Sequence, residues 1–263
     1  MKTLKELCIP RKSIFDKSKR DTVLDLTDLM ENGKINPNDF FTENYLTDGL
    51  KNLYESVFKR FEGRSEDGVF RLTQTMGGGK THSMIALGLL SKFPDFRQQV
   101  MGQFFQTTFE KTANVIAFSG RDSDTKYGIW GYIAEKLGKR EELANYYSPL
   151  QAPGQTTWVK LLKGEPLLIL LDELPPYFQN AQAIQIGDSN LATVTATAIT
   201  NLLMAVGKGE LSNVCVVISD LTANYAEGKA VMQAIFNDFS YSNVQTYTDL
   251  SGQPRVTYGQ WHP

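Results

Sequence analysis

The stretch FRLTQTMGGGKTHSM, residues 70–84, combines a short β-rich run, three consecutive glycines and a Lys-Thr pair. It resembles the phosphate-binding pattern G-x-x-x-x-G-K-[ST]. That pattern has its first glycine at position 74, where this chain has Gln74. The position begins the loop and does not itself bind phosphate, so the motif tolerates the change. For this motif alone, a surface turn without a ligand is the alternative reading.

The residue types that follow position 76 suit an anion site. Gly77, Gly78 and Gly79 have no Cβ atom, so their backbone N–H groups can approach phosphate oxygens closely. A helix that begins near Lys80 adds its positive N-terminal end. Lys80 would reach the β- and γ-phosphates of ATP, and the hydroxyl of Thr81 would bind Mg²⁺. The sequence therefore predicts ATP and Mg²⁺ as cofactors.

Composition limits the class of protein. The 263 residues are 41% hydrophobic and 21% charged, with a net charge of -2, as in an ordinary soluble globular protein. The net charge does not support DNA binding, although it does not exclude a local basic groove. With only Cys8 and Cys215, a disulfide framework is not expected, and the cytoplasm fits best. The longest apolar stretch is too short to span a bilayer, so no membrane association is expected.

Periodicity divides the chain into three parts. Residues 1–62 form a predicted N-terminal extension that is partly helical, with apolar residues at helical spacing from Leu46 to Phe58. We expect this helix to pack on the following domain. Residues 63–236 form the predicted core, and residues 237–263 form a polar, turn-rich tail.

The core alternates between short apolar runs and helical segments. Apolar runs at 68–73, 114–120, 167–171 and 212–220 predict strands. Helices are predicted over 80–93, 127–147, 156–164, 191–207 and 228–236. The run Leu167 to Leu171 is continuously apolar, which is typical of a strand buried on both faces. This alternation predicts an α/β fold, a doubly wound and mostly parallel sheet covered by helices.

Polar residues follow these strands at the edge where parallel sheets bind ligands. Asp172 would hold Mg²⁺, and Glu173 would orient and deprotonate an attacking water. An Asp-Glu pair after a strand is often a solvated turn, but its place about ninety residues after the glycine loop makes the combination specific. Ser219 or Asp220 would lie near the γ-phosphate if their strand lies between the other two. An ordinary strand-end turn is an equal alternative there.

Two further residues have weaker cases. Arg121 follows a strand end and could meet phosphate or a partner, although a solvated surface arginine is the simpler reading. His82 is a candidate nucleotide contact, and packing at the helix start is an equal alternative.

Four segments together resemble a known family: RLTQTMGGGKTHSMIALGLL, FSGRDSDTKYGIWGYIAEKLG, LLILLDELPPYF and ISDLTANYAEG. They look like a group of large bacterial P-loop ATPases that has long been catalogued as a domain of unknown function. Members are similar to AAA+ ATPases and occur in phage-defence operons, including BREX-type systems and islands with DNA methyltransferases. The resemblance covers roughly residues 9–235.

The resemblance implies a three-layer P-loop NTPase of the AAA+, additional-strand type, which binds and hydrolyses ATP within a defence complex. Gly79, Lys80, Thr81, Asp172 and Glu173 correspond to the family's motif positions. Protein partners or a homo-oligomer are expected. In additional-strand ATPases the position predicted for Ser219 belongs to a sensor residue.

Such proteins are usually several times longer, and no segment here is long enough for the helical lid of AAA+ enzymes. The chain is therefore expected to be a fragment or the product of a changed reading frame. A nucleotide-dependent switch or scaffold with negligible turnover is the alternative function. A small-molecule kinase is a weaker one, and a DNA-translocating motor has no support from charge.

Overall fold

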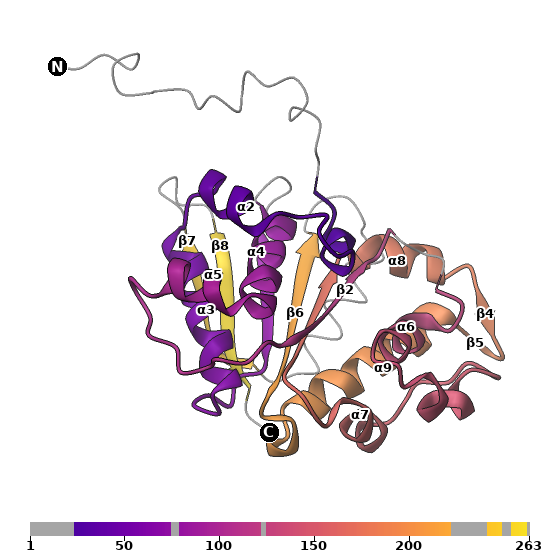
Figure 1. The fold of residues 1–263 in the computed structure, drawn as a ribbon. Coiled ribbons are helices and arrows are strands. Elements are labelled where there is room, and N and C mark those ends of the chain that lie inside the picture. The colour runs from indigo at the N-terminus through magenta and orange to yellow at the C-terminus, as the bar shows by residue number, and fades with distance from the viewer. Residues whose placement is uncertain (1–23, 75–78, 122–124, 222–240, 249–253, 262–263) are drawn as a thin grey trace, which may run out of the picture.

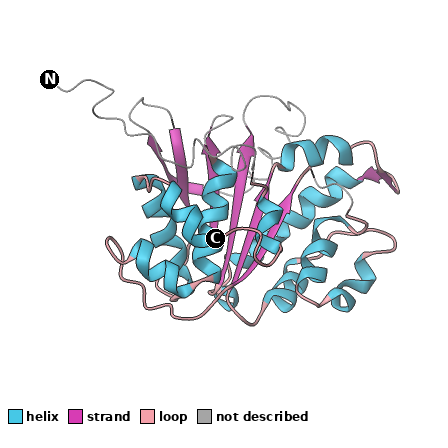
Figure 2. Ribbon diagram, turned by 45° about the horizontal axis from the view of Figure 1, so that its top comes forward, coloured by secondary structure: helices cyan, strands magenta, loops and turns pink. Residues whose placement is uncertain are grey.

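A computed structural model of the chain describes residues 24–74, 79–121, 125–221, 241–248 and 254–261. A central sheet runs through the molecule, with helices packed against both of its faces (Figure 1). Figure 2, coloured by secondary structure, shows the strands between two groups of helices. The predicted α/β class is confirmed.

The central sheet has six strands in the order β2-β3-β6-β1-β8-β7. They are β1 (Val69–Gln74), β2 (Asn114–Ser119), β3 (Leu167–Asp172), β6 (Val214–Leu221), β7 (Tyr241–Thr248) and β8 (Pro254–Trp261). The first four strands in that order are parallel, β8 is antiparallel to β1, and β7 is antiparallel to β8. The sheet is therefore mostly parallel, as predicted.

The β7–β8 pair lies in the range 237–263, for which the sequence predicted only a polar, turn-rich tail. These strands extend the central sheet beyond β1, so this part of the tail belongs to the sheet. The predicted helix over 228–236 lies outside the described residues.

The helices form two groups, each with its own buried cluster. One face carries η3 (Leu26–Met30), α2 (Pro37–Glu43), α3 (Asp48–Phe61), α4 (Lys80–Lys92) and α5 (Pro94–Met101). The other carries α6 (Gly128–Lys136), η4 (Arg140–Tyr146), α7 (Gln155–Leu162), α8 (Leu174–Ala181), α9 (Leu191–Val206) and η5 (Gly209–Leu211). A small hairpin of β4 (Gln185–Ile186) and β5 (Ser189–Asn190) joins α8 to α9.

Strand β3 explains why both faces need helices. Leu168 and Leu170 belong to the cluster under α4, whereas Leu167, Ile169 and Leu171 belong to the cluster on the opposite face. All five side chains are buried, as the continuous apolar run predicted.

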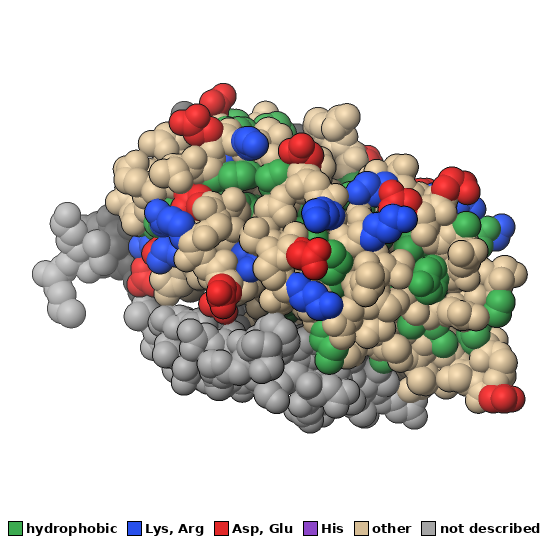
Figure 3. Space-filling view, turned by 90° about the horizontal axis from the view of Figure 1, so that it is seen from below, with side chains coloured by type: hydrophobic (Ala, Val, Ile, Leu, Met, Phe, Trp, Pro, Cys, Tyr) green, Lys and Arg blue, Asp and Glu red, His purple; other side chains and the backbone are tan. Residues whose placement is uncertain are grey.

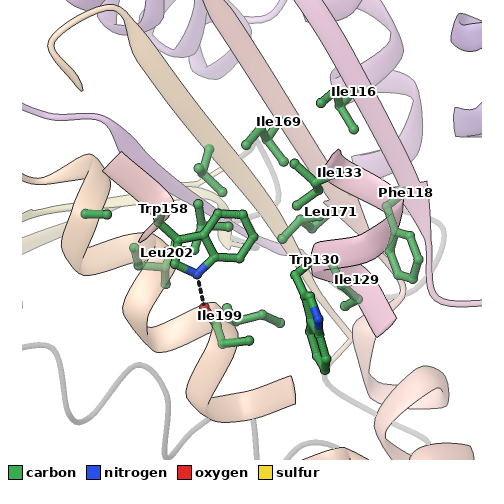
Figure 4. Close-up of a cluster of buried hydrophobic side chains, with 14 of the residues drawn as sticks. Ile116, Phe118, Ile129, Trp130, Ile133, Trp158, Ile169, Leu171, Ile199 and Leu202 are labelled. Carbon is green, nitrogen blue, oxygen red and sulfur yellow. Dashed lines mark hydrogen bonds between the residues drawn. The ribbon is translucent and has the colours of Figure 1, made fainter. Parts of the chain in front are cut away.

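Figure 4 shows the cluster on the α6–α9 face, where two tryptophans are buried. Trp158 lies against α9 and donates a hydrogen bond from Nε1 to the carbonyl oxygen of Ala198 at 3.0 Å. A buried indole N–H needs such a partner, because an unsatisfied donor in the core costs free energy.

Local backbone signals set the helix limits. Thr47 caps α3 by accepting a hydrogen bond from the backbone N–H of Leu50, and α3 packs in the same cluster as α4, as expected. The stretch 127–147 is largely helical, as predicted, but it is divided into α6 and η4. Gly138 adopts φ +67° after α6, and a 3-10 helix follows instead of further α-helix. Among the described residues, no helix is long and apolar enough to cross a membrane.

Candidate functional site: the carboxyl edge of the sheet

The register of the parallel strands brings the predicted polar residues to one edge. Ser119 at the end of β2 is aligned with Asp172 at the end of β3, and Ser219 on β6 is aligned with Leu72 on β1. Strand β6 lies between β3 and β1, which meets the condition set for Ser219 in the sequence. The side chain of Asp220 lies outside the described residues.

The glycine loop ends in a left-handed residue that starts a helix. Gly79 has φ 76° and ψ 22°, a conformation that a side chain would strain. Its carbonyl oxygen accepts the backbone N–H of Ser83 at 2.8 Å, and α4 begins at Lys80. Gly77 and Gly78 lie outside the described residues. The positive end of a 13-residue helix therefore lies where the sequence predicts the phosphates.

A buried carboxylate joins the helix start to the sheet edge. Asp172 is 3% exposed, and its Oδ2 accepts a hydrogen bond from the hydroxyl of Thr81 at 2.5 Å. The hydroxyl of Ser219 and the backbone N–H of Glu173 donate to Oδ1, the latter at 2.9 Å. The structure thus brings together three residues that the sequence singled out, from α4, β3 and β6.

This donor set fits a magnesium ion in its chemistry. Hydroxyl and carboxylate oxygens are the ligands that Mg²⁺ prefers, and one or two protein ligands suffice when phosphate and water supply the rest. Within the described ranges, no group of three or more His, Cys, Asp or Glu side chains could hold a metal ion by itself. Thr81 and Asp172 would therefore hold Mg²⁺ only together with oxygens from a ligand.

The turn after β3 is strained and closely packed. Glu173 has φ 52° and ψ 36°, and no other non-glycine residue in the described part of the chain has positive φ. Such a conformation costs about 1–2 kcal/mol. A Cβ atom on Gly120 would lie 2.0 Å from the carbonyl oxygen of Glu173, so only glycine fits at the end of β2. The Gly120 N–H donates to the carbonyl oxygen of Asp172 at 2.8 Å, which holds the turn in place.

The carboxylate of Glu173 is turned toward β2. Its Oε2 lies 2.7 Å from Nε of Arg121 and accepts a longer hydrogen bond, 3.5 Å, from the hydroxyl of Ser119. The side chain of Glu173 is 24% exposed and that of Arg121 is 61% exposed. Sequence reasoning missed this ion pair and the contact with Ser119. The signal that could have found both contacts is the pairing of two predicted strands. One is followed by Gly120 and Arg121, and the other by Glu173.

The side chain of His82 points toward α2 and not toward Asp172, the partner of Thr81. Its ring stacks on Phe40 of α2, with centroids 4.5 Å apart and an interplanar angle of 22°. Its Nε2 is hydrogen-bonded to Oδ1 of Asn44, which follows α2. Burial lowers the pKa of His82 below its ordinary value. The structure therefore places His82 on the side of α4 that packs against the N-terminal segment.

Comparison with known proteins gives one family match. The model of the DUF499 N-terminal domain matches residues 4–102 and 110–248, a range that includes α4, all four parallel strands and β7. No curated protein matches this chain. No solved structure matches it either. The resemblance to a family catalogued as a domain of unknown function is confirmed, and the chain belongs to the family described as the DUF499 N-terminal domain.

Proposed function

We propose that this chain is a P-loop ATPase domain that binds MgATP and hydrolyses it to ADP and phosphate. The observation that carries the proposal is the contact between Thr81 and Asp172 at 2.5 Å. It joins the start of the helix behind the glycine loop to the acidic end of β3. These are the two parts that hold a nucleotide phosphate and its metal in P-loop proteins.

Each residue at this edge has a role that its position supports. Lys80 would neutralise charge on the β- and γ-phosphates, and Thr81 and Asp172 would hold Mg²⁺. Bound Mg²⁺ would supply positive charge to phosphate oxygens. Glu173 would accept a proton from an attacking water. Ser219, which is fully buried and bonded to Asp172, would fix the orientation of that carboxylate.

The strand order supports an AAA+-like, additional-strand type of P-loop fold. In the order β2-β3-β6-β1, one strand lies between the strand before the glycine loop and the strand that ends in Asp172. Ser219 on this intervening strand would take the place of a sensor residue in such ATPases. The sensor role belongs to the same proposal.

The biological setting is proposed from the family resemblance. We place the domain in a cytoplasmic anti-phage defence complex, with protein partners or further copies of the chain. On the face shown in Figure 3, Lys and Arg side chains are interspersed with Asp and Glu. A mixed surface of this kind gives DNA binding no support.

Replacement of Glu173 by Gln tests the proposal. The amide cannot accept the proton, so phosphate release should fall by about 10²–10⁴-fold while the Kd for MgATP stays close to that of the wild type. Glu165→Gln is the matched control, since Glu165 is exposed and precedes the amino end of the same strand, β3. Turnover that survives in the Glu173→Gln variant would show that the assigned base is wrong.

A nucleotide-dependent switch with negligible turnover is the second candidate. The ion pair between Glu173 and Arg121 favours it, because a carboxylate held by a guanidinium is not available as a base. The same assay separates the two functions. Tight MgATP binding by the wild type without phosphate release would favour the switch. Phosphate release that depends on Glu173 would favour the ATPase.

A further inference from the structure

The N-terminal segment from Leu26 to Asn44, here called the N-terminal strap, contacts α4 near both of its ends. At the last turn, Nζ of Lys92 donates to the carbonyl oxygen of Leu29 at 2.6 Å. One turn earlier, a Cβ atom on Gly88 would lie 2.6 Å from Cδ1 of Leu29, so the side chain of Leu29 packs directly over Gly88 and would have to shift for a larger residue. At the first turn, the strap contacts His82.

The contact at the first turn is a hydrogen bond combined with a ring stack. Nδ2 of Asn44 donates to the carbonyl oxygen of Phe40, which leaves Oδ1 to accept from Nε2 of His82. Phe40 is 6% exposed and stacks on the imidazole. Asn44 thus ties the end of α2 to the residue that follows Thr81.

The strap is also held independently of His82. Asn36 caps α2 through a hydrogen bond from the backbone N–H of Asn38 at 2.9 Å. Phe41 stacks on Phe96 of α5, with ring centroids 6.4 Å apart. With Leu29 in contact with the other end of α4, the strap has several contacts besides the one with His82, and the first turn of α4 can be held against it.

We propose that Asn44 is a positioning residue of the phosphate site: through His82 it fixes the first turn of α4, and so sets the affinity for the nucleotide. The inference rests on the proposed function. Lys80, Thr81 and His82 share one helical turn, and a shift of that turn moves the backbone N–H groups and the Lys80 side chain together. Displacements near 1 Å are enough to weaken such a site strongly.

The effect should appear in binding more than in chemistry. Glu173 directly follows β3, Ser219 lies on β6, and neither residue takes part in a contact of the strap described above. Their positions should therefore survive a change at Asn44. Loss of the hydrogen bond should raise the Kd and the KM for MgATP by about threefold to tenfold, the range for one hydrogen bond, and change kcat less.

The experiment uses the full chain and separates the hydrogen bond from the stack. His82→Phe keeps a ring against Phe40 but loses the bond, whereas His82→Gln keeps a donor for Asn44 and loses the ring. Asn44→Ala and His82→Phe should raise the Kd for MgATP alike, and the double variant should be no worse than either single one. His82→Gln should stay close to the wild type.

Thr42→Ala is the control on the strap. Thr42 is exposed on α2, and its hydroxyl bonds only to the carbonyl oxygen of Asn38 among the contacts described, at 2.7 Å. The Kd of the Thr42→Ala variant for MgATP should equal that of the wild type. The thermal unfolding curve of each variant is measured first. The Kd values are then determined at a temperature at which every variant is folded.

Two results would overturn the inference. One is an unchanged Kd in Asn44→Ala or, if that variant does not fold, in His82→Phe. The other is a full loss of affinity in His82→Gln with none in His82→Phe, since the ring and not the bond would then matter. Failure of the proposed function looks different: the wild type would not bind MgATP, or Lys80→Ala would bind it equally well.

Discussion

Two buried arginines, Arg60 and Arg97, have different kinds of partners from the buried Asp172. Arg60 on α3 is 2% exposed, and its guanidinium donates to the backbone carbonyls of Ser65, Glu66, Val206, Leu211 and Val214. Arg97 on α5 is 1% exposed, lies 4.7 Å from the ring centroids of Phe58 and Phe109, and donates to the carbonyls of Leu90, Ser91, Phe109 and Lys111.

Asp172 is buried to the same degree, but its described partners include the side-chain hydroxyls of two other elements, Thr81 and Ser219. Backbone carbonyls fixed by the fold cannot change partners, whereas a hydroxyl can turn toward a ligand after a rotation about one bond. The arginines therefore hold the scaffold together. The aspartate belongs to a group of side chains that could rearrange around the proposed Mg²⁺.

The largest effect on stability should come from Arg60→Met, which keeps much of the apolar stem and removes the donors. Several buried carbonyl oxygens then lose their partners, so the free energy of unfolding should fall by about 3 kcal/mol. Denaturant titration measures this loss. The Kd for MgATP of the folded variant should not change, because the described contacts of Arg60 include none of the residues at the carboxyl ends of the strands.

The neighbouring Lys59→Met is the matched control for Arg60. Lys59 is 40% exposed in its side chain and pairs with Glu55 at 2.6 Å, an arrangement worth less than about 1 kcal/mol. If the two variants lose the same stability, the carbonyl contacts of Arg60 do not support the scaffold as argued.

For Ser219→Ala we expect a smaller effect, and it should appear in the turnover rate. The change removes the hydroxyl that bonds to Asp172, so the carboxylate is less well oriented and kcat should fall by about tenfold. Ser91→Ala is the control, because Ser91 is equally buried but bonds to the carbonyl oxygen of Leu87 within α4. Steady-state phosphate release should separate the two serines. Equal losses would mean that burial, and not contact with Asp172, decides the effect.

The sequence could predict the features that depend on local patterns. Continuous apolar runs and the residues that end them are local patterns, so β3, Asp172 and Glu173 were found at the right edge. The mostly parallel sheet followed from the alternation of strands and helices. Thr81 and Asp172 could be placed at the same edge from the sequence, because each lies at the end of its own predicted element.

Contacts between distant segments were not predictable in this way. Arg121 meets Glu173 only because β2 pairs with β3 in a register that aligns Ser119 with Asp172. His82 turns toward α2 because of a segment about forty residues earlier in the chain. Neither relation leaves a periodic pattern. Strands β7 and β8 were missed for a related reason, since their polar sequence has no apolar run of the kind that marked the other strands.

The smallest predicted effect concerns the pH dependence of stability through His82. Burial lowers the pKa of His82 in the folded chain below its ordinary value of 6.5, which the unfolded chain keeps. As the pH falls below 6.5, the unfolded chain takes up a proton before the folded one does. The free energy of unfolding should therefore fall as the pH drops through this window, and the loss stops below the folded-state pKa.

The measurement compares the wild type with His82→Gln by denaturant titration between pH 7.5 and 5. Many carboxylates contribute to the pH dependence of both chains, so the difference between the two curves isolates His82. The difference should be constant above the ordinary histidine pKa of 6.5 and should shift in favour of the variant below it. A difference that shifts the other way would mean that the folded chain holds the imidazolium. The contact between His82 and Asn44 would then have a charged donor instead of a neutral one.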